Sequence, residues 1–198
     1  LSDDVLIPAD YAEALAARQQ SLKSLTPHAP QTNNTPAAID TSGFMLGTVL
    51  VKICLLSGPW ADATITKYAA DVKADMEWWA AKAPQNRLHF MYESPTKIGS
   101  GSGLEGGMAA IVSVLKLPAV GASGPTGALR AYMDRERKRV GADWAYAAMV
   151  NDSSGRASAY LGGPALSDYV HLDGYQDRLI AVGHESGHIF WANDEYKG

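Results

Sequence analysis

An almost uninterrupted apolar run at residues 47–58, GTVLVKICLLSG, constrains the fold of this chain more than any other feature. Gly47 opens the run, and Gly58 with Pro59 closes it. A short apolar run between turn-forming residues is typical of a buried β-strand. We therefore expect this segment to be the first strand of a sheet.

Helical and extended patterns alternate after this strand. From Asp62 to Ala83, apolar side chains recur at the spacing of one helical face, and Pro84 ends the pattern. Further helices and strands are expected at residues 87–94 (strand), 108–117 (helix), 126–140 (helix) and 143–152 (strand, followed by a turn at 151–155). Such alternation predicts an α/β fold, in which helices back a twisted mixed sheet.

Two glycine-rich or turn-rich segments are interpreted as connections. Residues 97–107, KIGSGSGLEGG, are expected to form a loop, and they lack the GxxxxGK[ST] pattern of a phosphate-binding loop. Residues 166–174 are expected to lead into a last helix at 176–190. That helix would contain Gly183 and Gly187, each costing about 1 kcal/mol relative to alanine, so we expect its backbone to pack closely against a neighbouring element.

The chain divides into a short N-terminal part and one larger domain. Residues 1–44 combine a helical segment with a linker rich in Pro, Thr and Asn, and residues 45–198 form the domain. A net charge of -4 argues against nucleic acid as a partner. No segment approaches the roughly 20 apolar residues of a membrane span, and the first ten residues lack the pattern of a secretory leader.

The segment His184-Glu185-Ser186-Gly187-His188 carries the predicted chemistry. On a helix, residues four apart project from nearly the same face, so His184 and His188 can reach one metal ion. Glu185 would lie beside them, placed to take a proton from water without binding the metal itself. This arrangement predicts a site for one zinc ion that activates water. A catalytic zinc normally has three protein ligands, and either Asp194 or Glu195 would supply the third.

At these residues the sequence resembles the metzincin branch of the zincin peptidases, whose motif is HExxHxxGxxH or the same with Asp last. It is still more similar to secreted bacterial metallopeptidase-like proteins with HExxHIFxAxDEY, which also share DWAY at residues 143–146 and YLGGP at 160–164. The resemblance implies a zincin-like upper subdomain and a secreted zinc endopeptidase. It also implies that His184, His188 and Asp194 bind zinc while Glu185 acts as general base.

Two departures from the metzincin pattern leave alternatives open. Trp191 replaces the glycine of the motif, so Glu195 stays a rival third ligand. Metzincins also have a methionine-containing turn after the third ligand, and residues 195–198 contain no methionine. We therefore expect the domain to be truncated at its C-terminus. The competing hypotheses are a structural or adhesive protein that retains a zincin scaffold, and a zinc hydrolase that does not act on peptides.

Zincins bind an extended peptide or protein substrate along an edge strand by main-chain hydrogen bonds. The segment SAYLGGP at residues 158–164 is the candidate for that strand. Tyr160, Leu161 and Gly162 are accordingly the predicted substrate-binding residues.

Overall fold

The computed structural model describes residues 47–83, 87–120, 122–160, 162–172 and 181–190. Within them, one sheet has the strand order β2-β1-β4-β6-β5, and β3 also pairs with β1. The strands are β1 Gly47–Leu56, β2 Leu88–Tyr92, β3 Thr96–Gly99, β4 Trp144–Gly155, β5 Ser158–Ala159 and β6 Ala165–Leu172. The helices are α2 Asp62–Lys82, α3 Gly103–Val114, α4 Gly124–Val140 and α5 Ala181–Ile189.

The sheet is mixed, as predicted, because one short edge strand opposes the others. β1 runs parallel to β2, β3 and β4, and β4 runs parallel to β6. Among the described strands only β5 is antiparallel, through the pairs Ser158↔Ser167 and Ala159↔Leu166. The predicted α/β class is therefore confirmed.

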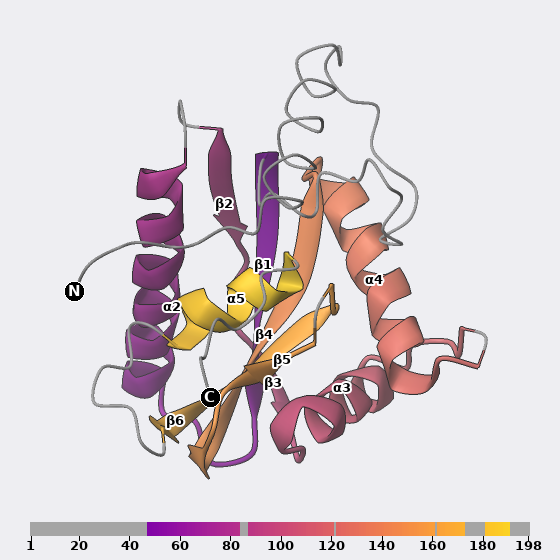
Figure 1. Ribbon diagram of the computed structural model, residues 1–198. Helices are drawn as coiled ribbons and strands as arrows, with labels where there is room; N and C mark the ends of the chain where they lie inside the picture. The colour runs from indigo at the N-terminus through magenta and orange to yellow at the C-terminus, as the bar shows by residue number, and fades with distance from the viewer. Residues whose placement is uncertain (1–46, 84–86, 121, 161, 173–180, 191–198) are drawn as a thin grey trace, which may run out of the picture.

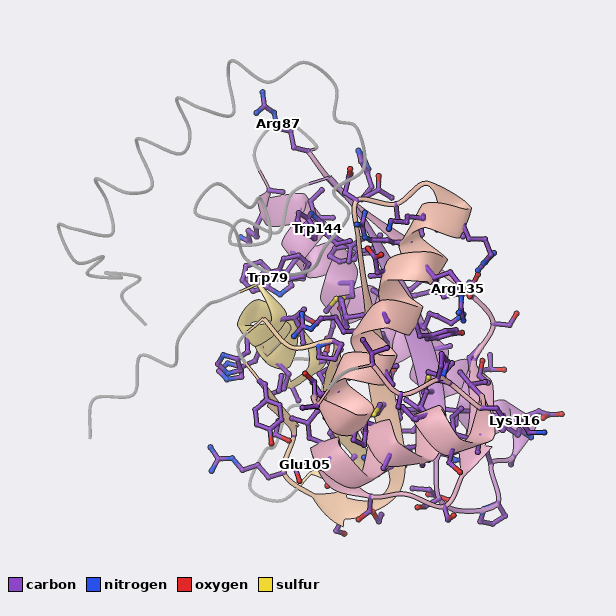
Figure 2. The ribbon with its side chains drawn as sticks, turned by 90° about the vertical axis from the view of Figure 1, so that its right-hand side faces the viewer. Trp79, Arg87, Glu105, Lys116, Arg135 and Trp144 are labelled. Carbon is purple, nitrogen blue, oxygen red and sulfur yellow. The ribbon has the colours of Figure 1, made fainter. Side chains whose placement is uncertain are left out.

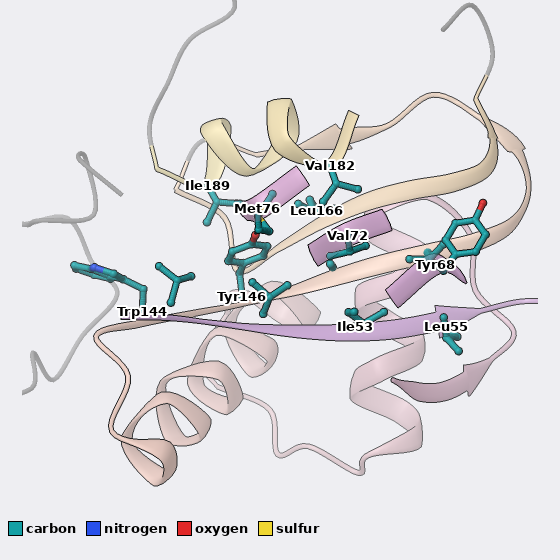
Figure 3. Packing of buried hydrophobic residues seen from close by; sticks show 14 of the residues in the cluster. Ile53, Leu55, Tyr68, Val72, Met76, Trp144, Tyr146, Leu166, Val182 and Ile189 are labelled. Carbon is teal, nitrogen blue, oxygen red and sulfur yellow. The ribbon is translucent and has the colours of Figure 1, made fainter. Parts of the chain in front are cut away.

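Helices cover both faces of the sheet (Figure 1). Val49, Val51 and alternate residues of β1 pack with α2 and α5 in one core cluster, and Leu50 with its alternates packs against α3 and α4 in a second. Figure 3 shows the first cluster, in which Val72 and Met76 of α2 meet Val182 and Ile189 of α5 over the sheet. Because β1 is buried on both faces, it needs a continuous apolar sequence rather than an alternating one.

The glycine-rich segment is not a loop, contrary to the sequence-based prediction. Its first residues belong to β3, which pairs with β1, and α3 already begins at Gly103. A Cβ added at Gly107 would lie 2.6 Å from Leu56 Cδ1 and 2.8 Å from Met149 Sδ. The glycine therefore allows α3 to pack closely on the sheet, a contact that local sequence does not reveal.

Two further predictions were wrong at the end of β4. The expected turn at residues 151–155 is strand, because β4 continues to Gly155 and pairs with β6 through a register shift between Asn151 and Ser154. Residues 165–172 are themselves the strand β6 rather than a lead into the last helix. The N-terminal segment predicted at residues 1–44 lies outside the described residues. Among the described helices, none is long and apolar enough to cross a membrane.

Candidate metal centre

Three side chains of α5 converge to form a group that could hold a metal ion. One ligand atom from each of His184, Glu185 and His188 lies within 4.8 Å of the other two. The two imidazole rings are 4.9 Å apart and nearly perpendicular, and His188 Nε2 lies 4.0 Å from Glu185 Oε2. Two imidazoles and a carboxylate suit zinc and several other divalent transition metals. The donor set thus fits a metal ion without specifying which one.

The helix that carries this group is almost entirely buried. It spans nine residues, Ala181–Ile189, of which His184 alone is partly exposed. Because most helical stability in proteins comes from tertiary packing, tertiary contacts must define the position of α5. Contacts at its N-terminal end, its middle and its C-terminal end do so.

Two residues of α2 hold the first described turn of α5. Trp79 Nε1 donates a hydrogen bond of 2.9 Å to the carbonyl oxygen of Gly183, and Figure 2 shows Trp79 beside α5. The Asp75 carboxylate accepts hydrogen bonds from the backbone N–H groups of Gly183 and Val182. Burial raises the pKa of Asp75 to about 7, although these N–H groups oppose the shift. α2 therefore bonds to both polar groups of the Gly183 backbone.

A fully buried hydroxyl pair fixes the middle of α5. Ser186 Oγ lies 2.8 Å from the Tyr146 hydroxyl of β4, and both oxygens contact Met76 Sδ, at 3.5 and 3.0 Å. Ser186 is therefore a link between α5 and the sheet. It occupies one of the unspecified positions of the HExxH pattern, so the pattern itself does not indicate this role.

The turn between β5 and β6 holds the C-terminal end. The Gly162 N–H donates to the His188 carbonyl at 2.9 Å, and Arg130 of α4 donates to the Gly162 carbonyl at 2.9 Å. The N–H and carbonyl groups of Gly162 are thus both hydrogen-bonded within the protein. Tyr160 is half exposed, and its hydroxyl donates to Glu105. The substrate-binding role of Tyr160 and Gly162 stays a prediction, and Leu161 lies outside the described residues.

The candidates for a third ligand, Asp194 and Glu195, also lie outside the described residues. The sequence-based prediction missed Asp75, Trp79 and Tyr146, all of which position α5. One signal was present for Asp75: it lies three residues after Val72 on the apolar face of α2, and a carboxylate there requires a polar partner.

Comparisons of the chain with family models, with curated proteins and with solved structures each found no match.

Proposed function

We propose that the chain is a zinc-dependent endopeptidase with a zincin-like fold. His184 and His188 bind the ion, Asp194 or its rival Glu195 completes the ligand set, and Glu185 is the general base. The observation that carries the proposal is the convergence of His184, Glu185 and His188 within 4.8 Å on one buried helix. The secreted location expected from the sequence belongs to the same proposal.

Zinc, when bound by such residues, acts as a Lewis acid that makes water acidic enough to lose a proton near neutral pH. Glu185 then accepts that proton on a carboxylate oxygen and later transfers it to the leaving amine. The distance of 4.0 Å between Glu185 Oε2 and His188 Nε2 supports this role for Glu185. Its largely buried environment restricts the carboxylate to this neighbourhood.

The sheet edge supports an extended peptide as the substrate. β5, Ser158–Ala159, covers the first two residues of the segment 158–164 proposed for substrate binding, lies at the edge of the sheet antiparallel to β6, and contacts α5. An unpaired strand edge offers N–H and C=O groups to a peptide that adds as a further strand. A peptide bound along β5 would pass near the group formed by His184 and His188.

Replacing Glu185 by Gln tests the catalytic proposal, because the amide keeps the shape but cannot accept the proton. We expect Glu185→Gln to retain zinc and to lose cleavage of a fluorescent protein substrate by about 10²- to 10⁴-fold. Glu77→Gln, on an exposed position of α2, is the control for loss of one carboxylate. A Glu185→Gln protein that cleaves as fast as the wild type would refute the proposed base.

The second candidate is a structural or adhesive protein that retains this scaffold without catalysis. This candidate is favoured because the N–H and carbonyl groups of Gly162 are hydrogen-bonded to His188 and Arg130, so neither is available to bind a substrate main chain. In that case zinc would raise the melting temperature while neither the wild type nor Glu185→Gln cleaves protein. Calorimetry with and without a chelator, run beside the cleavage assay, separates the two candidates.

A further inference from the structure

The peptide group that joins Gly183 to His184 is bound directly by a side chain of another helix. The Gly183 carbonyl and the His184 N–H belong to one planar unit. Trp79 Nε1 donates to that carbonyl at 2.9 Å, across 104 positions of sequence. The orientation of the peptide plane from which His184 projects is therefore tied to α2.

Asp75, one turn before Trp79 on α2, also binds the backbone of α5 next to His184. Residues 75 and 79 of α2 lie on one helical face, since they are four apart. Asp75 accepts from the N–H groups of Gly183 and Val182, which lie in the first described turn of α5. Asp75 is itself only 5% exposed, so water competes little for these bonds.

We propose that Trp79 and Asp75 are positioning residues for the metal ligand His184, an inference that rests on the proposed metal site. Helix geometry fixes His184 relative to His188, but it does not fix either residue relative to a third ligand from another segment. That relation depends on how α5 docks. Metal ligands are usually oriented through their rings by hydrogen-bonded neighbours; here the orientation acts through the backbone.

Trp79→Phe tests the proposal because it removes the N–H donor and keeps an aromatic ring. Trp60→Phe is the matched control: Trp60 Nε1 also donates to a buried backbone carbonyl, that of Leu56 at 3.2 Å, at the end of β1. We expect Trp79→Phe to weaken zinc binding about 10-fold, measured by chelator competition, and to change the visible spectrum of bound Co²⁺. Trp60→Phe should leave both unchanged. Equal effects of the two variants on zinc affinity and spectrum would overturn the proposal.

Asp75 provides a second test that does not depend on Trp79→Phe folding. Asp75→Ala should weaken zinc binding as Trp79→Phe does, and Asp75→Asn should restore it, since the amide oxygen can accept the same N–H groups. Failure of Asp75→Asn to restore binding lost in Asp75→Ala would contradict positioning by these hydrogen bonds.

Hydrogen exchange separates this proposal from the proposed function, because it needs no metal. In the metal-free protein, the amides of residues 184–188 should exchange faster in Trp79→Phe than in Trp60→Phe. Equal exchange rates would overturn the positioning role even if the wild type binds zinc. If Trp79→Phe exchanges faster but the wild type binds no zinc, Trp79 still positions α5, while the proposed metal site and the proposed peptidase are both refuted.

Discussion

Single residues in this protein carry roles that depend on distant partners. His184, Glu185 and His188 were predicted as a group because they lie within five consecutive residues, and helix geometry alone brings them together. Trp79 and Asp75 could not be assigned in this way, since they meet Gly183 only when α2 and α5 dock on the sheet. Local patterns thus predicted the group that could hold a metal ion, but not the residues of α2 that contact its helix.

The pKa of Asp75 leads to a prediction about pH. The folded value of about 7 lies above the value of about 3.9 expected in the unfolded chain. Between these values the native carboxyl keeps its proton and the unfolded one does not, so the free energy of unfolding falls as pH rises. Asp75→Asn cannot ionise and should avoid this loss, which amounts to about 1.4 kcal/mol for each tenfold difference in proton affinity between the folded and unfolded carboxyl.

Urea unfolding at several pH values measures this effect. We expect the stability advantage of Asp75→Asn to grow from about pH 4 to pH 7 and then to level off. Asp62→Asn, whose parent side chain is fully exposed at the start of α2, controls for loss of one negative charge. If the free energies of unfolding of Asp75→Asn and the wild type changed with pH in parallel, burial of Asp75 would not be the cause of the pH dependence.

At the scale of elements, predictions succeeded where the local pattern and the packing agree. β1 and α2 appear within a few residues of their predicted bounds, because β1 is almost continuously apolar and α2 is amphipathic over 21 residues. β3 and the start of α3 were missed, since their glycines look like loop residues until close packing with Leu56 and Met149 is known. β6 was missed because buried Asp168 and Ser167 interrupt its apolar pattern.

Two helical glycines should respond in opposite ways to replacement by alanine. At Gly107 a methyl group would collide with Leu56 and Met149, both fully buried, so Gly107→Ala should lower the free energy of unfolding by about 1–3 kcal/mol. At Gly183 the nearest atom, Trp79 Nε1, would be 3.4 Å from the added methyl, an ordinary contact. Close packing therefore does not require glycine there, and Gly183→Ala should be neutral or stabilising by up to about 1 kcal/mol.

Denaturation midpoints measured side by side test this contrast. An equal loss of stability in the two variants would mean that α5 is packed as tightly as α3, contrary to the contact distances.

At the scale of the whole molecule, the single cysteine lies at the centre of the fold. Cys54 on β1 is 4% exposed, and burial raises the pKa of its thiol to about 12. Since the thiolate is the reactive form, native Cys54 should resist labelling by a disulfide reagent. Labelling should accelerate in urea together with loss of secondary structure, because exposure of β1 requires the core to open.

Labelling followed at increasing urea concentration, with circular dichroism as the reference, checks this expectation. Rapid labelling in native buffer would indicate local opening of β1 without unfolding. Gly107→Ala offers a comparison, because a destabilised core should accelerate labelling although Cys54 itself is unchanged.

The pairing of β1 with β4 has a consequence for the order in which the protein takes shape. Val49 pairs with Trp144, so the centre of the sheet cannot close until residue 144 has been made. Such distant parallel pairing makes folding slow, and α5 docks on a surface that β4 and β6 must first provide. During synthesis, the group formed by His184, Glu185 and His188 would therefore be assembled after the strands on which α5 packs, so the core forms before these side chains converge.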